Sequence, residues 1–561
     1  MMKNLKDYMQ ETERHRIIND EKTVNFIYPK RILKTEGCVE NSEALLEVRE
    51  GQATLEAGEL CMMKKSNGKA YILLDYGFEM HGGVQITTHA TAGSVRVTFG
   101  ESAMEALSDI GGNKGATNDH AIRDSVYKLS WLGTTNIGNT GFRFVKIELA
   151  DDTEELAIKT IRAAFTYRDL PYKGTFDCSD EKLNKIWQTA AYTVQLNMQD
   201  FVWDGIKRDR LVWIGDMHPE VSTIQYVFGE HDCVTKSLDL IRNNTPIPNV
   251  MNGIPAYSMW WVLIHRDWFR QNGNINYLEE QHTYIADLVK FLSGFIGEGG
   301  VSNIENNFLD WPSSTNPEGQ KAGVHSLFIL TMNAAADIFD ALEDEQNADF
   351  ARLCAKKLSA HLYDPNGLKQ AYALQVLAGI RKPEEVAETL IKNGVHGYST
   401  FLGYYILKAL GQAEKIDEAL DHIKEYWGTM LDLGATTFWE DFDIDWAQNC
   451  STLDEILEPG TTKKDIHGDF GGYCYTGYRH SLCHGWASGP APFLMEYVLG
   501  IRPIKPGCKQ VLIAPELGSL SFAKGSYPTP YGIISVEHTR SENGEIKTLV
   551  DAPDEIEIVL G

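Results

Sequence analysis

Three carboxylates, three cations and a tryptophan fall within one short stretch, DGIKRDRLVWIGD at residues 204–216. Burying so many charges costs free energy unless they are paired and hydrogen-bonded. Apolar segments with helical periodicity flank the stretch, so we expect it at the edge of a core, facing a cavity. Carboxylates and arginines around a cavity are typical of a site that hydrolyses glycosidic bonds. The structural alternative is that the carboxylates cap helices, with Asp216 or His218 as an N-cap, and the arginines bind carbonyls.

A second stretch, GATTFWE at residues 434–440, leads through small residues to an aromatic–carboxylate pair. Glu440 directly follows Trp439, a pattern typical of an active-site base on a rigid loop. Asp441, Asp443 and Asp445 come next, and for these three an exposed acidic loop is the simpler interpretation.

Tryptophans recur beside acidic residues or histidine near the predicted helix–loop junctions. An aromatic face stacks on the C–H face of a sugar ring, while Asp, Arg and His side chains bind its hydroxyls. Taken singly, each tryptophan is more often part of a core than of a binding site. The candidates are Trp260, Trp261, Asp310, Trp311, Trp439, His484 and Trp486.

The elements that must position these residues fall into three stretches. Short alternating or apolar runs, separated by Gly, Asn and Asp, predict an antiparallel β-sandwich over residues 1–170. Helical periods dominate residues 171–500, after an N-cap at Ser179 or Asp180, and predict a toroid of helical hairpins. A solenoid is the rival, but we find no repeat of fixed period. Strand patterns over residues 501–561 predict a small C-terminal β-sheet domain.

The composition restricts the partners. The net charge is −26, which disfavours nucleic acid and anionic membranes, because both need clustered Lys and Arg. We find no run of about 18 apolar residues and no apolar run typical of a signal peptide, so we expect neither a transmembrane helix nor secretion. The nine cysteines lack C-x-x-C spacing. They indicate reduced thiols in a cytoplasmic protein, without a disulfide framework or a metal site.

Four motifs in this order resemble the α-L-rhamnosidases of glycoside hydrolase family 78. They are DGIKRDRLVWIGD at 204–216, DW at 310–311, GATTFWE at 434–440 and SLCHG at 481–485. The likeness extends to FDCSDEKLNKIW at 176–187, GFRFVKI at 141–147 and the closing β segment. The resemblance implies an (α/α)6-barrel catalytic domain with antiparallel β-sandwich domains on both sides. It also implies inverting hydrolysis of terminal α-L-rhamnosides, with no metal or cofactor in the chemistry.

The resemblance assigns roles by position in the motifs. An inverting glycosidase uses one carboxylic acid to protonate the glycosidic oxygen and one carboxylate to activate water on the opposite face of the sugar. Asp209 takes the place of the acid, and Glu440 that of the base. The implied sugar-binding residues are Asp204, Arg208, Trp213, Asp216, Trp260, Trp261, Asp310, Trp311, Trp439 and His484.

The acid position departs from the family pattern. Many members carry Glu there, whereas Asp209 is one methylene shorter. Arg208 and Arg210 flank it, and nearby cations lower the pKa of a carboxyl group. An extended backbone would point both arginines away from the face of Asp209. A helical backbone would bring them closer, and Asp204 or Asp216 would then be the candidate acid.

The leading hypothesis is a cytoplasmic exo-α-L-rhamnosidase that acts on small rhamnose-containing glycosides. A second hypothesis keeps the fold and changes the sugar to a related deoxyhexose or a mannose-configured sugar. A third is a catalytically silent carbohydrate-binding protein. The oligomeric state, including a homodimer, stays an open hypothesis.

Overall fold

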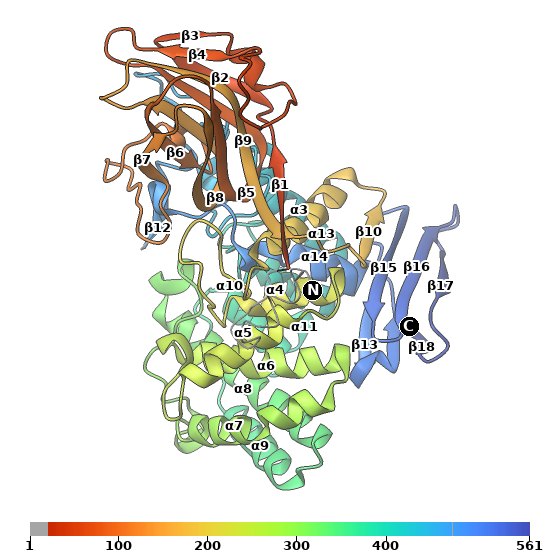
Figure 1. Ribbon diagram of the computed structural model, residues 1–561. Helices are drawn as coiled ribbons and strands as arrows, with labels where there is room; N and C mark the ends of the chain where they lie inside the picture. The colour runs from red at the N-terminus through yellow and green to blue at the C-terminus, as the bar shows by residue number, and fades with distance from the viewer. Residues whose placement is uncertain (1–20, 474) are drawn as a thin grey trace, which may run out of the picture.

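The computed structural model describes residues 21–473 and 475–561. Figure 1 shows three parts: a β-sandwich at the top, a helical barrel below it and a smaller pair of sheets at the side of the barrel. The predicted fold class, a six-hairpin barrel flanked along the chain by β domains, is confirmed.

The sandwich is built from nine antiparallel strands in the described part of the chain. Its main order is β3-β4-β9-β5-β8-β6-β7, with β1 added to β9 and β2 to β5. Register shifts in the pairing of the two longest strands, β5 (Tyr71–Thr88) and β8 (Gly133–Leu149), let them bend around one core. The other strands are β1 (Lys22–Ile27), β2 (Arg31–Glu36), β3 (Cys38–Glu40), β4 (Cys61–Lys64), β6 (Gly93–Gly100), β7 (Asp124–Leu129) and β9 (Glu155–Arg168).

Twelve helices of the described residues form the barrel. The even-numbered helices make a closed inner ring, in which each contacts the next and α14 returns to α4. The inner helices are α4 (Met217–Val227), α6 (Pro255–Asn272), α8 (Pro317–Ala341), α10 (Lys369–Leu377), α12 (Gly403–Gln412) and α14 (Pro490–Phe493). The others are α3 (Glu181–Asn197), α5 (Asp232–Asn244), α7 (Ile275–Ser293), α9 (Glu345–Leu358), α11 (Pro383–Ile391) and α13 (Ile416–Asp432).

Two local predictions concern the ends of these helices. Asp180 is the N-cap of α3, and its side chain accepts from the backbone N–H groups of Lys182 and Leu183, as predicted. Asp216 occupies the N-cap position of α4 but makes no capping hydrogen bond, which leaves its side chain for other partners. One helix, α8, has the length and composition to span a membrane, but 83% of its most apolar window is buried inside the protein. It is the longest member of the inner ring.

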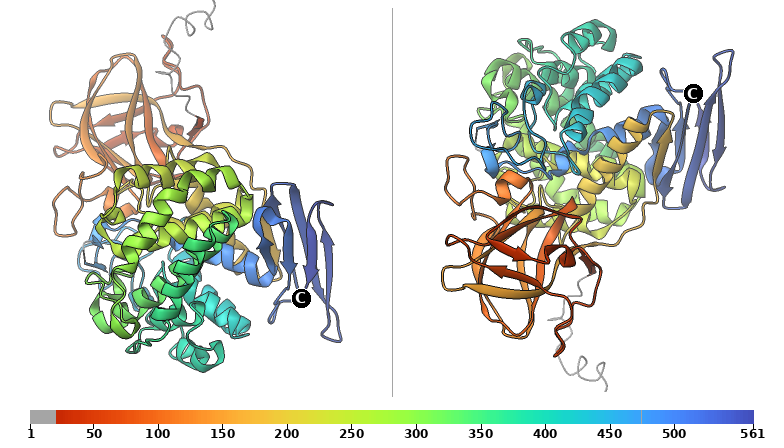
Figure 2. Two further views of the ribbon diagram at one scale, coloured as in Figure 1. Left: turned by 90° about the horizontal axis from the view of Figure 1, so that it is seen from below. Right: turned by 90° about the horizontal axis from the view of Figure 1, so that it is seen from above.

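The C-terminal part differs from the predicted antiparallel sheet in two respects. Its first sheet, β10-β15-β16-β17, includes β10 (Thr175–Cys178), which precedes the barrel in the sequence. In its second sheet, β14 pairs in parallel with the last strand, β18. Figure 2 shows this part and the sandwich on different sides of the barrel. The strands are β13 (Ile501–Lys505), β14 (Gln510–Ile513), β15 (Phe522–Thr529), β16 (Gly532–Arg540), β17 (Ile546–Asp551) and β18 (Glu557–Leu560).

Candidate functional site

The charged stretch at 204–216 forms the loop between α3 and α4, against the sandwich. Ile206 packs into the sandwich core. Strand β8 comes so close here that a Cβ atom on Gly141 would lie 2.8 Å from the Ile206 side chain. Lys207 binds the sandwich residues Glu101 and Glu105, with N–O distances of 2.9 and 3.3 Å. The sandwich therefore fixes the loop from one side.

The backbone of this loop is neither extended nor α-helical at the candidate acid. Asp209 and Arg210 both have positive φ, at 54° and 56°. Left-handed backbone costs free energy for residues other than glycine, although Asp tolerates it better than most. The segment is therefore neither extended nor helical at this point but left-handed. In this backbone geometry the side chains of Arg208 and Arg210 point in different directions.

Only one of these arginines contacts the Asp209 carboxylate. The Nη1 group of Arg208 donates to Oδ1 at 2.9 Å. The Trp213 indole donates to Oδ2 at 3.0 Å. Arg210 turns away, since it donates to the carbonyl of Asn139 and lies over the ring of Trp203.

Arg208 joins the two candidate catalytic carboxylates. Its Nη2 group lies 2.5 and 2.6 Å from the two carboxylate oxygens of Glu440, while Nη1 holds Asp209. The guanidinium also lies 3.8 Å from the centre of the Tyr475 ring. One planar group therefore sets the spacing of both carboxylates.

Glu440 sits on a rigid backbone and is ionised. Its carbonyl accepts hydrogen bonds from the Thr400 hydroxyl and the Trp486 indole, at 2.6 and 2.8 Å. Burial alone would raise the pKa of its carboxyl group. Arg208 and His484 outweigh burial and lower that pKa to about 2. A carboxylate that is charged at neutral pH meets the first requirement of a general base.

His484 forms a second link between carboxylates. Its Nε2 atom lies 2.9 Å from Asp216, which also accepts from the Tyr257 hydroxyl at 2.8 Å. Burial opposes a charge on the ring, but Glu440 and Asp216 outweigh it and raise the pKa of His484 to about 9. Its Nδ1 atom has no hydrogen-bond partner among the described residues and lies 3.8 Å from Glu440. This buried N–H donor is free to bind a ligand hydroxyl.

Asp204 and Asp216 are less suited than Asp209 to act as the acid. Burial raises the pKa of each, which would suit a general acid, but both are at least 97% buried and therefore poorly accessible to a glycosidic oxygen. Their oxygens are engaged: Asp204 accepts from the Leu211 backbone at 2.9 Å, and Asp216 binds His484 and Tyr257. They hold the loop and orient its neighbours, and Asp209 is the more accessible of the three.

The structure divides the predicted aromatic residues into two groups. Trp213 touches Asp209, and Trp311 packs against Phe308 and Tyr475, the residue that covers Arg208. These two line the site. Trp439 supports it from behind, because it is buried and packs edge-on against Phe442.

Trp260 and Trp261 are not brought to the candidate catalytic carboxylates, and Asp310 lies near Asp441 without a hydrogen bond to Asp209 or Glu440. Trp260 packs between His218 and Tyr405 on the inner ring. Trp261 donates to the Leu238 carbonyl on the side facing α5. The oxygens of Asp310 accept from the Ser313 backbone and the Ser399 hydroxyl. In this structure all three build the core and the loops, and the core interpretation of these tryptophans holds.

Three residues near the site were not predicted from the sequence, and for a fourth, Asp441, the predicted exposure was wrong. His120 contacts Asp209 from a sandwich loop, and Tyr257 and Tyr475 line the site. Asp441, predicted to be exposed, is 8% exposed, and burial together with Asp310 and Glu440 raises its pKa to about 7. The only sequence signal for His120 was its acidic neighbour at 119 in a polar loop, which is common on surfaces.

A cavity of about 650 Å³ lies against the segment that follows the base. Asp441 and Phe442, which follow Glu440 in sequence, line it together with Tyr473 and Trp446. Gln370 also lines it, and the Oε1 atom of Gln370 is buried without a partner among the described residues. The volume is that of a pocket for a small molecule.

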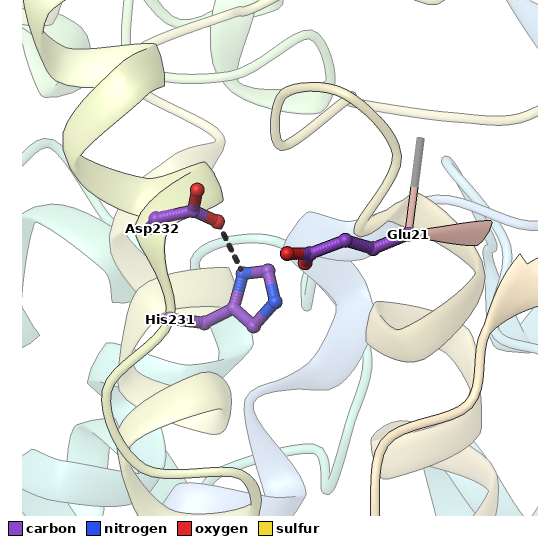
Figure 3. Close-up of side chains that lie close together, drawn as sticks. All are labelled: Glu21, His231 and Asp232. Carbon is purple, nitrogen blue, oxygen red and sulfur yellow. Dashed lines mark ion pairs between the residues drawn. The ribbon is translucent and has the colours of Figure 1, made fainter. Parts of the chain in front are cut away.

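Two clusters have the composition of a metal site. The first, Glu21, His231 and Asp232, is shown in Figure 3, where Glu21 reaches toward the start of α5. Here Glu21 pairs with Arg168, and His231 caps its own helix. The second is Glu101, Glu105 and His467.

In the second cluster the positive charge comes from a lysine side chain of the protein, that of Lys207. The Lys207 ammonium binds both glutamates and lies 3.4 Å from the Nε2 atom of His467. Both clusters are therefore explained by ion pairs within the protein.

Comparison with known proteins places these features in one family. The family model for the bacterial alpha-L-rhamnosidase six-hairpin glycosidase domain matches residues 171–498. The model for the bacterial alpha-L-rhamnosidase C-terminal domain matches residues 500–560.

Curated relatives are distant and longer. An alpha-L-rhamnosidase of Alteromonas sp. (strain LOR) is 24% identical over 72% of this chain and 46% of that protein. Another, from Formosa agariphila, is 23% identical over 86% of this chain and 54% of that protein. The chain thus spans about half the length of these relatives.

Solved structures show the same fold. The family 78 rhamnosidase of Bacillus sp. GL1 superposes with a TM-score of 0.74, at 22% identity, over 92% of this chain and 55% of that one. The rhamnosidase from Klebsiella oxytoca with rhamnose bound gives a TM-score of 0.66, at 21% identity, over 88% of this chain and 99% of that one.

Proposed function

Because this chain belongs to the bacterial α-L-rhamnosidase family, we propose that it hydrolyses terminal α-L-rhamnosides with inversion at the anomeric carbon. One observation carries the proposal: a single guanidinium, that of Arg208, holds Asp209 and Glu440 on its two arms. Inverting glycosidases separate their carboxyl groups by about 6.5–9.5 Å, which leaves room for a water molecule. Two carboxylates at opposite ends of one guanidinium are compatible with that spacing.

In the proposed reaction Asp209 donates a proton and Glu440 accepts one. Asp209 in its protonated form donates to the glycosidic oxygen as the bond to the anomeric carbon breaks. Glu440 takes a proton from water, whose oxygen attacks the same carbon from the other face. Positioning the acid, the base and the water in one geometry supplies much of the rate enhancement.

The neighbouring side chains would bind the sugar. The free Nδ1–H of His484 donates to a hydroxyl group, and Trp213 and Trp311 provide apolar faces for the methyl group of a 6-deoxysugar. The cavity lined by Asp441 and Phe442 leaves room for further parts of a small glycoside. A terminal rhamnosyl unit of a small glycoside is the substrate that we propose.

The test uses an aryl α-L-rhamnoside. The protein is expected to release L-rhamnose from p-nitrophenyl α-L-rhamnoside, and a panel of aryl glycosides separates rhamnose from related deoxyhexoses and mannose. Asp209→Asn and Glu440→Gln should each reduce turnover by about 10²-fold or more. Full activity in the Glu440 variant would remove the proposed base.

One observation favours a second candidate, a silent carbohydrate-binding protein. Arg208 and the Ser481 backbone N–H already donate to the oxygens of Glu440, which leaves fewer acceptor sites for a catalytic water. Calorimetry that detects rhamnose binding, with no hydrolysis of any glycoside in the panel, would favour this candidate over the enzyme.

We also propose that the protein works in the cytoplasm. The eight described cysteines are free thiols, and six of them are buried, which suits a reducing compartment. Cell fractionation of the native host with an antibody tests the proposal, and recovery outside the cytoplasm would contradict it.

A further inference from the structure

We propose that the cavity of about 650 Å³ is a second carbohydrate-binding site, which takes a neutral sugar unit through Lys369, Gln370 and Asp441. This sugar is a different unit from the rhamnosyl unit held at Asp209 and Glu440. The inference deepens the proposed function and, where it concerns substrates, rests on it. A protein with both sites would favour rhamnosylated oligosaccharides over simple aryl rhamnosides, because two linked contacts bind more tightly than one.

The cavity lies at the same end of the barrel as the carboxylate site but next to other inner helices. Its walls include the segments that lead into α8, α10 and α12, with Pro312, Leu368 and Tyr398. Asp216 lies where the chain enters α4. The inner helices of successive hairpins run in the same direction, so both sites lie at their N-terminal ends. Trp311 lines one site, and the next residue, Pro312, lines the other.

Lys369 is a buried cation with unused hydrogen-bond donors. It is 8% exposed, and its Nζ group donates to the Gly394 carbonyl at 2.6 Å, the one acceptor that it contacts in the described part of the chain. Burial lowers the pKa of Lys369 to about 8, so the ammonium form still dominates at neutral pH. An ammonium group has three N–H donors. Two of them are therefore left for a ligand in the cavity.

Two buried acceptors line the same cavity. Gln370 is 1% exposed, and its Nε2 group donates to the Gly397 carbonyl at 2.8 Å, which leaves Oε1 without a partner among the described residues. Asp441 is 8% exposed, and no other described side chain donates to its carboxyl group. Buried polar groups in native proteins are almost always hydrogen-bonded. A ligand with hydroxyl groups would supply the hydrogen bonds that these two side chains lack.

The charges of the lining favour a neutral ligand. Lys369 and Lys392 are balanced by Asp441 and Asp443, so the walls carry no strong net charge of either sign. A sugar hydroxyl both donates and accepts hydrogen bonds. One neutral sugar unit can therefore accept from the ammonium of Lys369 and donate to the oxygens of Gln370 and Asp441.

Trp446 provides the apolar contact that a sugar ring needs. The indole lines the cavity, and Phe470 stacks on it with ring centres 5.5 Å apart and 14° between the planes. This packing fixes the orientation of the indole. An aromatic face in a fixed orientation stacks on the C–H face of a sugar while polar side chains bind the hydroxyls.

Ligand-detected NMR tests the site without using activity. The probes are the methyl glycosides of D-glucose, D-galactose, D-mannose and D-xylose, with D-glucosamine and D-glucuronic acid as cationic and anionic comparisons. Saturation transfer should detect a neutral probe on the wild type with a millimolar Kd, and Lys369→Met and Gln370→Leu should each weaken its binding about ten-fold. No binding of any neutral probe, or tighter binding of a charged sugar, would overturn the proposal.

Paired variants separate the two sites. Lys369→Met should weaken binding of the neutral probe and leave the Kd of L-rhamnose within about two-fold of the wild type, and His484→Asn should do the reverse. Lys356→Met and Gln412→Leu, at exposed positions of α9 and α12, are the matched controls. If a buried variant fails to fold, Trp446→Ala, at a partly exposed position, gives the same test. Equal losses of both ligands in a folded variant would overturn the second site.

This proposal and the proposed function fail in different ways. If the wild type hydrolyses no rhamnoside while the neutral probe binds and Lys369→Met weakens it, the proposed function fails and the second site stands. If the wild type is active and no neutral probe binds, the second site fails alone. In an active enzyme KM should be lower for rhamnosyl oligosaccharides than for p-nitrophenyl α-L-rhamnoside, and Trp446→Ala should remove the difference. Equal KM values in the wild type would overturn the substrate preference.

Discussion

The guanidinium of Arg208 holds both carboxylate oxygens of Glu440, at 2.5 and 2.6 Å. This bidentate pair is buried, and its other arm reaches Asp209. Arg208 therefore controls the charge on the proposed base and the position of the proposed acid together.

Replacing Arg208 by Gln tests this control. The loss of one charged donor in an active site reduces kcat by about 10²–10³-fold. The pKa of Glu440, held at about 2 by Arg208 against the effect of burial, should rise above its ordinary value. The acidic limb of the pH profile of kcat/KM should then move up by about two units or more. An unchanged acidic limb would show that Glu440 does not set it.

The same pair contributes pH-dependent stability. The folded-state pKa of Glu440 lies below that of the unfolded chain, so its stabilisation is complete above pH about 4.3 and is lost as the pH falls toward 2. Thermal unfolding from pH 5 to 2.5 should show a steeper loss of stability in the wild type than in Glu440→Gln. Parallel curves would contradict the buried ion pair.

His484 should have the opposite dependence. Its folded-state pKa is raised to about 9, so its stabilisation is complete below pH about 6.5 and is lost as the pH rises through 9. Thermal midpoints of the wild type and His484→Asn should differ most below pH 6.5 and converge by pH 9.5. A difference that does not change with pH would mean that His484 is not charged in the folded protein.

Glu220 on α4 is a buried carboxyl group behind the site. Neither of its carboxyl oxygens has a hydrogen-bond partner within the described residues. Among the groups around Glu220, only the Asn197 side chain favours the charged carboxylate. Burial, with Asp216 and Asp204, raises its pKa well above the ordinary value, so the folded state binds a proton that the unfolded state releases above pH about 4.3. This group therefore lowers stability as the pH rises from there.

Glu220→Gln should remove that penalty. The variant should gain about 1–3 kcal/mol at pH 7 and little at pH 4, as measured by denaturant unfolding. Glu279→Gln, at an exposed position of α7, is the control for loss of a charge. A loss of stability at pH 7 in Glu220→Gln would contradict a protonated, uncharged Glu220.

Variants of Trp261 and Trp213 test which tryptophan belongs to the core and which to the site. Trp261→Phe should lower stability by about 1–3 kcal/mol while kcat/KM stays within about two-fold of the wild type, because Trp261 packs in the core. Trp213→Phe should lower kcat/KM by about ten-fold or more, because it removes a donor to Asp209. A large loss of kcat/KM in Trp261→Phe, with little change in Trp213→Phe, would show that Trp261 and not Trp213 acts in the site.

The sequence allowed the three parts of the fold to be predicted because their hydrophobic periods differ. Helical periods identified most of the barrel helices, and alternation identified strands such as β5 and β8. Periodicity could not show that β10 leaves the barrel segment to join the C-terminal sheet, since strand partners are set by tertiary packing.

The same limit applies to the site. The motifs pointed to Asp209 and Glu440, which the structure brings onto one guanidinium. They could not separate Trp213 from Trp261, because the direction in which a tryptophan faces depends on neighbouring helices. His120 lies 89 positions from Asp209, in another domain, and no local pattern predicts such a contact.

The anomer of the sugar first released from an α-L-rhamnoside tests the central claim most directly. If Glu440 activates water while Asp209 protonates the leaving group, ¹H NMR at early times should detect β-L-rhamnose before mutarotation forms the α anomer. α-L-Rhamnose as the first product would contradict the account, because it would make a carboxylate of this site a nucleophile.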